Sequence, residues 1–305
     1  MASIQPYHVS CPYSIGSSFH LRINPPFGPS FHARATVVKT YEPFTISPVM
    51  QVSLNATMPG EHLPPHLPTQ LVLKVYDRRF AHGLREYYGL QPLTGELEAL
   101  YHRYVASGRA PEGYDAISDR IDEYGGFKQA PPELLEHFVA NEIAPYFRNE
   151  YLVYHRLQSL QGRDIPRFYG STEFTGGSSI PGLSTSVPGI LIELIEGINL
   201  EEIDPSSFDL NNVFNDALRI INQCGELGVL NHDVRLSNFI VRPRGSVVMI
   251  DFAQARLRRG DESDLDWKRM KWDEDEEGIA HHSNVNPIDS CERLIEKYLN
   301  AIEIT

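Results

Sequence analysis

Two short motifs contain the residues best suited to chemistry. The first, NHDVRLSN, runs from Asn231 to Asn238 and places Asp233 five residues before Asn238. The second, VVMIDFA, ends an apolar run on Asp251. Carboxylate and amide oxygens are ligands that Mg²⁺ prefers, and a carboxylate can take a proton from a hydroxyl group. Each motif alone arises often by chance, whereas the ordered pair with a hairpin between them is more specific.

These motifs resemble the catalytic loop and the metal-binding motif of the protein-kinase-like superfamily. Three upstream features follow the order of that superfamily: a strand lysine, a helix glutamate and a hinge, found here as Lys74 in LVLKVY, Glu150 in EYLVYHRL and residues 193–197, ELIEG. The resemblance covers about residues 34–255, and LKVYDRRF and IDFAQAR are similar to a minimal kinase-like group of fungal hypothetical proteins. It implies an α+β, two-lobed protein-kinase-like fold with a small antiparallel-sheet N-lobe and a shortened, mostly helical C-lobe.

The resemblance assigns catalytic and metal-binding roles within the two motifs. Asp233 would accept the proton of an incoming hydroxyl group. Arg235 stands where protein kinases carry a lysine, and it would steady the charge of the transferring phosphoryl group. Asn238 and Asp251 would supply oxygen ligands for Mg²⁺.

The upstream residues would hold ATP. The compact charge of Lys74 suits the α- and β-phosphates, and Glu150 would hold that lysine as an ion pair. Backbone groups at Glu193 and Ile195 would contact adenine, with Ile192 at the back of the pocket. The expected cofactors are therefore ATP and Mg²⁺.

We expect a phosphotransferase that moves the γ-phosphate to a hydroxyl group, with a protein acceptor favoured by Arg235. Two alternatives stay open: a pseudokinase that serves as a nucleotide-binding or protein-binding scaffold, and a small-molecule kinase of the aminoglycoside or choline type. Residues 41–48, between the first two predicted strands, contain no glycine, so backbone amides there approach phosphate less freely. The motifs also read Asn-His-Asp and Asp-Phe-Ala in place of His-Arg-Asp and Asp-Phe-Gly, and no Ala-Pro-Glu follows.

Several of these residues also have plainer interpretations. Lys74 could lie on the solvent side of its strand, and Glu150 could be an exposed helix acid with Glu142 as a competitor for its role. Asp233 and Asn238 could simply cap turns, because their side chains readily bond to nearby backbone.

The hydrophobic pattern predicts the elements that position these residues. Short β-branched runs predict antiparallel strands at 34–41, 48–55 and 70–77, and two further strands at 165–174 and 188–195. Helices are predicted at 94–107, from Pro131 to about Leu160 with a bend at Pro145, at 209–226 with Asp209 as N-cap, and at 289–302. Residues 237–252 read as a hairpin, and the acidic stretch 273–277 reads as a solvated loop.

These elements suggest three parts: an irregular N-terminal arm at 1–33, an N-lobe at 34–195 with a helical insertion at about 78–140, and a C-lobe at 196–305. The length of 305 residues fits about two folded units, and a hydrophobic content of 41% rules out wholesale disorder. The formal net charge of −13 argues against nucleic-acid and anionic-membrane partners. Three distant cysteines predict neither a disulfide scaffold nor a zinc site. With no secretory signal and no transmembrane run in the sequence, we expect a cytoplasmic or nuclear protein that is not secreted.

Overall fold

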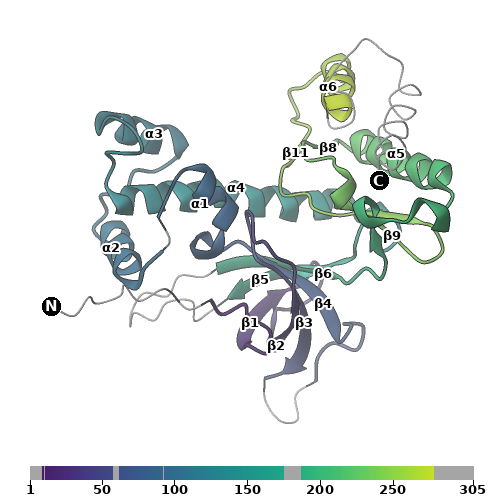
Figure 1. Ribbon diagram of the computed structural model, residues 1–305, viewed down its shortest axis with the longest axis horizontal. Coiled ribbons are helices and arrows are strands. Elements are labelled where there is room, and N and C mark those ends of the chain that lie inside the picture. The colour runs from purple at the N-terminus through teal and green to yellow at the C-terminus, as the bar shows by residue number, and fades with distance from the viewer. Residues whose placement is uncertain (1–8, 10, 58–61, 92, 175–186, 278–305) are drawn as a thin grey trace. The chain divides into compact units, whose positions relative to one another are not determined.

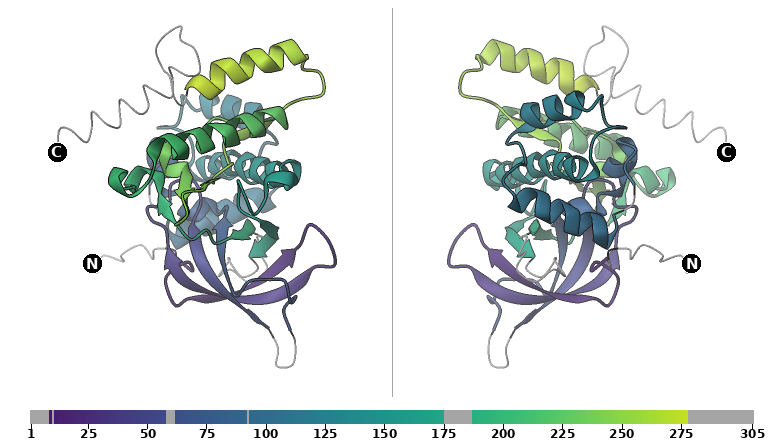
Figure 2. Two further views of the ribbon diagram at one scale, coloured as in Figure 1. Left: turned by 90° about the vertical axis from the view of Figure 1, so that its right-hand side faces the viewer. Right: turned by 90° about the vertical axis from the view of Figure 1, so that its left-hand side faces the viewer.

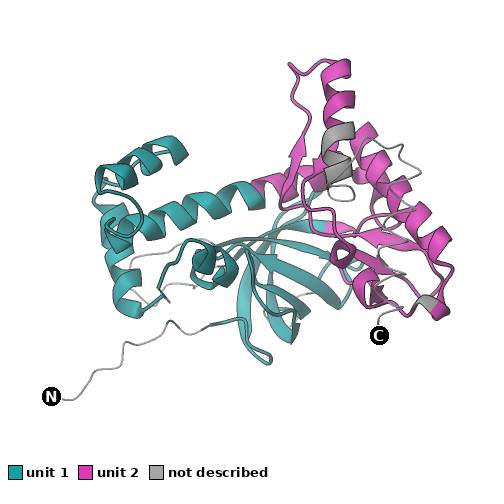
Figure 3. Cartoon of the chain, turned by 45° about the horizontal axis from the view of Figure 1, so that its top comes forward, with its two compact units in different colours: residues 1–147, 169–192 teal, residues 148–168, 193–305 magenta. Residues whose placement is uncertain are grey.

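A computed structural model describes residues 9, 11–57, 62–91, 93–174 and 187–277. The chain divides into two compact units (Figure 3). The first unit comprises Met1–Phe147 and Tyr169–Ile192, and the second comprises Arg148–Phe168 and Glu193–Thr305.

The first unit is built around a closed β-barrel (Figure 1). Its strands follow in the order β1 (Ser18–Asn24), β2 (Phe31–Thr40), β3 (Val49–Ala56), β4 (Gln70–Val75), β6 (Val187–Glu193) and β5 (Phe168–Phe174). Alternate side chains point inward, as the two-residue period of a strand requires, and the barrel core includes Leu21, Met50, Val52, Leu71 and Leu73. The three strands predicted at 34–41, 48–55 and 70–77 are thus confirmed.

The closed barrel shows that the two-lobed protein-kinase-like fold expected from the sequence is wrong. The strand that closes the barrel is β1, which lies inside the segment predicted to be an irregular arm. It pairs antiparallel with β2 on one side and β5 on the other, so Leu21 faces both Ala33 and Phe174. Phe19, Leu21 and Ile23 are buried, and the residues between them are exposed, which is the strand signal that the prediction missed.

Helices make up the rest of the first unit. They are the 3₁₀ helix η1 (Arg78–Phe80), α1 (His82–Tyr87), α2 (Gly95–Ala106), α3 (Tyr114–Glu123) and α4 (Pro132–Arg156), whose last residues belong to the second unit. Figures 1 and 2 show α1, α2 and α3 grouped around the first half of α4. The α2 helix begins where its sequence predicts, since the Thr94 hydroxyl accepts a hydrogen bond from the Leu97 amide at 3.2 Å. The α4 helix continues through Pro145.

The described part of the second unit combines short strands with helices. After the end of α4 and η2 (Gln158–Leu160) come β7 (Ile198–Asn199), η3 (Leu200–Glu202), η4 (Pro205–Ser207), α5 (Leu210–Glu226), β8 (Val229–Asn231), η5 (Leu236–Asn238), β9 (Phe239–Val241), β10 (Val247–Met249), β11 (Ala255–Leu257) and α6 (Asp264–Glu277). The strands form two small sheets, ordered β10-β9-β7 and β11-β8.

Some boundaries in the second unit were predicted well and others were not. Asp209 caps α5 as expected, because its carboxylate accepts from the Asn212 amide at 3.3 Å. The predicted hairpin is present as β9 and β10. The acidic stretch 273–277, predicted to be a loop, belongs to α6, and the predicted helix 289–302 lies outside the described residues. In the described part of the chain, no helix has the length and apolar character needed to cross a membrane.

Candidate functional site

In the loop between β8 and β9, both the backbone and the side chain of Asp233 are held by hydrogen bonds. The side-chain amide of Asn238 donates to the Asp233 carbonyl at 2.7 Å and to its carboxylate at 3.0 Å. The Asp233 amide donates to the side-chain oxygen of Asn231 at 3.2 Å. A guanidinium nitrogen of Arg235 lies 3.2 Å from the same carboxylate. The sequence therefore brings its three predicted catalytic residues, Asp233, Arg235 and Asn238, into direct contact.

Asp251 lies directly beside this loop. The Ile250 amide donates to the Asn238 carbonyl at 2.8 Å, and the Asn231 side chain donates to the Asp251 carbonyl at 2.9 Å. Asp251 has a φ of 64°, in the left-handed region that aspartate and asparagine enter more readily than most residues. Its carboxylate accepts from the Ala253 amide at 3.3 Å. The two sequence motifs thus form one site within the second unit.

Asn231 is a site residue that the sequence reasoning did not single out. Its amide oxygen holds the backbone of Asp233, and its amide nitrogen holds the backbone of Asp251. It stands at the start of the first motif, where the usual motif of the resembling family has histidine. A buried asparagine with both ends of its amide in use is a positioning residue, and its place in the motif was the available signal.

Glu150 joins the end of α4 to the Asp251 segment. Its side chain is fully buried and accepts from the Phe252 amide at 3.3 Å. The alternative of an exposed helix acid is therefore wrong. The neighbouring Tyr154 ring stacks on Phe168 at 5.3 Å between centroids and meets Phe252 edge-on at 5.7 Å. Burial, together with the charges of Glu150 and Asp251, raises the pKa of Tyr154 well above its usual value, so its hydroxyl stays protonated.

The predicted hinge is anchored to the segment before β5. The Glu193 amide donates to the Arg167 carbonyl at 2.9 Å, and its carboxylate accepts from the Arg167 amide at 3.0 Å. Arg242 lies 3.5 Å from the same carboxylate. Ile195 is half-buried, and Ile192 is buried in the first unit. The Glu193 amide is thus already engaged, and its predicted contact with adenine would need other backbone groups.

Lys74 is buried in β4 of the first unit, with an exposed fraction of 5%. Its ammonium lies 5.8 Å from the centroid of the Tyr76 ring. This burial contradicts the alternative in which the lysine lies on the solvent side of its strand. The predicted ion pair between Lys74 and Glu150 would join the two units and stays a prediction.

The oxygen atoms of Asn238 and Asp251 decide which metal the site could hold. Among the described residues, no three His, Cys, Asp or Glu side chains gather into a metal-binding group. A zinc-type cage therefore does not fit the described part of the chain. Mg²⁺ differs because it is commonly held by one or two protein oxygens together with water and substrate phosphates. One amide oxygen and one carboxylate on adjoining segments fit that pattern.

Comparisons with known proteins give no family for this chain. No protein-family model matches the sequence. No curated protein matches it either.

Proposed function

We propose that the second unit carries the catalytic residues of an ATP- and Mg²⁺-dependent phosphotransferase that acts on a hydroxyl group. The observation that supports this most is the shared hydrogen bonding of Asp233 and Asp251 through Asn231 and Asn238. It places a candidate general base next to two candidate metal ligands. Such proximity is what phosphoryl transfer asks of a protein, because positioning and charge stabilisation account for most of the catalysis.

Each residue of the site has a task in this proposal. The Asp233 carboxylate, held by Asn238 and Arg235, accepts the proton of the acceptor hydroxyl. Asn238 holds Asp233 through its amide nitrogen, and its amide oxygen would supply the first protein ligand. Asp251 would supply the second protein ligand. When bound, Mg²⁺ would neutralise phosphate charge and align the nucleotide.

The acceptor in this proposal is a protein hydroxyl group. Arg235 is 58% exposed along its side chain although its guanidinium contacts Asp233. An exposed arginine beside the base can meet a large acceptor and also steady transferring charge. We place this reaction in the cytoplasm or nucleus.

A second candidate is a scaffold that binds nucleotide without transferring phosphate. The glycine-free loop at 41–48 supports it. The carbonyls of Phe44 and Thr45 accept from the Gly83 and Leu84 amides at 3.4 and 3.2 Å, and Ser47 is buried. A loop fixed to α1 in this way is less adaptable to phosphate than a glycine-rich one. A small-molecule kinase remains a third candidate, which the acceptor panel below separates from a protein kinase.

Asp233→Asn tests the proposal because it removes the base and keeps the shape. We expect Mg·ATP affinity within about 2-fold of the wild type, since Asp233 should contact the acceptor rather than ATP. Phosphate transfer to a panel of protein and small-molecule acceptors should fall roughly 10²–10⁴-fold. Asp261→Asn is the matched control, because Asp261 is an aspartate of the same unit with a 79% exposed side chain.

Two results would contradict the phosphotransferase proposal. Equal transfer by the wild type and Asp233→Asn would show that Asp233 only caps a turn. Tight Mg·ATP binding with no transfer to any acceptor would favour the nucleotide-binding scaffold.

A further inference from the structure

The helical part of the first unit contains a continuous chain of aromatic rings. Tyr87 meets Tyr88 edge-on at 5.0 Å between centroids, and Tyr88 stacks on Phe127 at 5.3 Å. Phe138 contacts Tyr88 and Phe127 at 4.9 and 5.0 Å and reaches Tyr114 at 5.7 Å. We call these five residues the aromatic surface: Tyr87 ends α1, Tyr88 follows it, Tyr114 begins α3, Phe127 lies between α3 and α4, and Phe138 lies on α4.

Both ends of the aromatic surface lie in water. Tyr87 is 81% exposed and Tyr114 is 53% exposed, although Phe138 at the centre is buried. Packing alone does not explain such exposure, since a ring that serves only the core would be covered. Exposed aromatic rings at both ends of one connected cluster are therefore a candidate interaction site, as exposed apolar patches commonly are.

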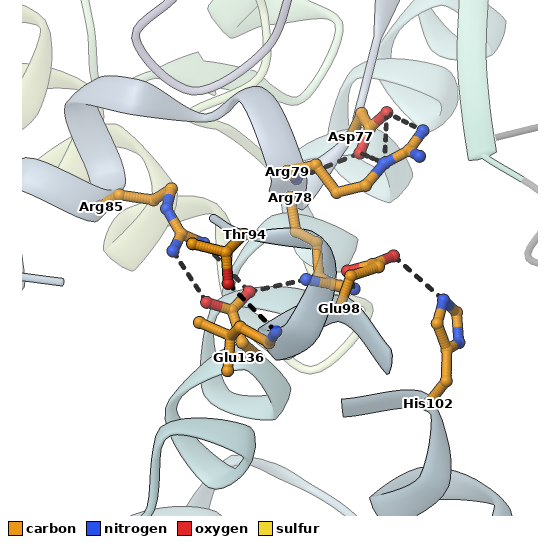
Figure 4. A network of polar contacts seen from close by, with 9 residues as sticks. Asp77, Arg78, Arg79, Arg85, Thr94, Glu98, His102 and Glu136 are labelled. Atoms are coloured by element: carbon orange, nitrogen blue, oxygen red, sulfur yellow. Dashed lines mark hydrogen bonds and ion pairs between the residues drawn. The ribbon is translucent and has the colours of Figure 1, made fainter. Parts of the chain in front are cut away.

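The surface rests on a rigid base of buried ion pairs (Figure 4). Arg85 of α1 donates to both carboxylate oxygens of Glu136 on α4, at 2.9 and 2.7 Å. Arg78 pairs with the same Glu136 at 2.6 Å and also with Glu98 of α2. The network thereby fixes α1, α2 and α4 to one another, so the helices that carry Tyr87 and Phe138 are held in place before a partner binds, which lowers the entropy cost of binding.

Acidic side chains lie on the same helices as two of these rings, α3 and α4. The Tyr88 hydroxyl donates to the Glu142 carboxylate at 2.9 Å. Tyr114 begins α3, which exposes Asp115, Asp119 and Asp122 at a spacing that puts them along one face of the helix. From residue 82 to residue 147 the sequence has 5 basic and 11 acidic residues, a formal net charge of −6.

We propose that the aromatic surface binds a lysine- and arginine-rich protein segment. Aromatic faces attract guanidinium and ammonium groups, and the neighbouring carboxylates add attraction for the same cations. Charge complementarity therefore selects a basic partner over an acidic or a neutral one. This inference concerns the first unit alone and does not depend on the phosphotransferase proposal.

Fluorescence anisotropy with a labelled octa-arginine peptide tests this inference. Tyr87→Ala and Tyr114→Ala leave the net charge unchanged, and each should weaken binding about 2- to 5-fold, the scale of one exposed cation–π contact. Tyr87→Phe keeps the ring and should bind within about 2-fold of the wild type. Phe27→Ala is the matched control, because Phe27 is also 81% exposed but lies between β1 and β2.

A triple charge reversal tests whether the acidic residues of α3 contribute to the attraction, and the charge-neutral tyrosine variants separate the aromatic surface from general attraction to an acidic protein. Asp115→Lys, Asp119→Lys and Asp122→Lys together should weaken peptide binding by more than either tyrosine variant. If the reversal weakens binding but both tyrosine variants bind like the wild type, the aromatic surface is not the site. Self-association that Tyr87→Ala abolishes, measured by sedimentation, would instead identify a second copy as the occupant and overturn the proposal.

Discussion

Paired charged side chains are buried in one region of this molecule and partly exposed in another. In the first unit, Arg78, Arg85, Glu98 and Glu136 form the buried network of Figure 4, and none of the four side chains is more than 10% exposed. In the second unit, Asp233 and Arg235 are also paired, but their side chains are 19% and 58% exposed. Arginine–carboxylate pairs are thus buried in the first unit and partly exposed to water in the second.

The difference separates a structural cluster from a candidate site. Burial opposes the charge of Arg78, but Glu98 and Glu136 outweigh burial and raise its pKa above the usual value. Each charge of that network needs the others, and no member can turn to a ligand without leaving a buried charge behind. Asp233 bears no such cost, because water can solvate the charge that a partner releases.

The largest effect is expected from Glu136→Gln in the buried network. This change leaves Arg78 and Arg85 without their shared negative partner, which should lower the free energy of unfolding by about 3–5 kcal/mol in urea denaturation. Glu123→Gln is the control, since Glu123 is 63% exposed and its pair with Arg120 should contribute below about 1 kcal/mol. If the two variants lose the same free energy of unfolding, the buried network contributes no more to stability than an exposed pair, and the contrast drawn here is wrong.

The substitution Lys74→Met tests whether this buried lysine of the first unit contributes to ATP binding. Methionine keeps the apolar stem of the side chain and removes its charge. We expect ATP affinity, measured by calorimetry, to fall by about 1–3 kcal/mol, the scale of a charged hydrogen bond. The melting temperature should hardly change. Unchanged ATP affinity would assign Lys74 to the barrel alone.

Asp164 extends the comparison inside the second unit, because it is a buried carboxylate that is fully paired. Burial raises its pKa, but hydrogen bonds from Arg219 at 2.7 Å and Arg163 at 2.8 Å outweigh burial, so its pKa lies below the usual value. A lowered pKa adds stability above the unfolded-state pKa of about 3.9, and this stability is lost as the pH falls through the folded-state pKa. Asp164→Asn should therefore lower the free energy of unfolding at pH 7. The difference in unfolding free energy between the variant and the wild type should become smaller below about pH 4. If this difference in unfolding free energy does not change with pH, the ion pairs of Asp164 are not its cause.

Only a small effect on stability is expected from Asp233→Asn. Its partner Arg235 is exposed, so loss of the pair should cost below about 1 kcal/mol in the same urea titrations. A cost as large as that of Glu136→Gln would make Asp233 a structural residue and remove the contrast between the two regions.

Local patterns predicted much of this structure. Short β-branched runs predicted β2, β3 and β4, the pattern at 94–107 predicted α2, and Asp209 was correctly predicted as the N-cap of α5. The predicted hairpin between the two motifs is present as β9 and β10, and it brings the Asp251 segment beside the loop of Asp233 and Asn238.

Barrel closure could not be predicted in the same way. It depends on β1 pairing with β5, a contact between segments about 150 residues apart that leaves no local signature. The role of Asn231 was hidden for a similar reason, since its contacts reach both Asp233 and Asp251. The buried network joins Arg78 to Glu136 across the insertion, and each of these residues looks like an ordinary surface charge in the sequence.

Calorimetric titration of ATP with Mg²⁺ and with EDTA is the most direct test of the central claim. Asp251→Asn is the variant of choice because asparagine also tolerates the left-handed backbone at this position, so the fold should survive. We expect the wild type to bind ATP with Mg²⁺ and to lose most of that affinity in EDTA, and we expect Asp251→Asn to bind weakly in both. Equal ATP affinity of the wild type with Mg²⁺ and with EDTA, or wild-type binding by Asp251→Asn, would contradict the site proposed here.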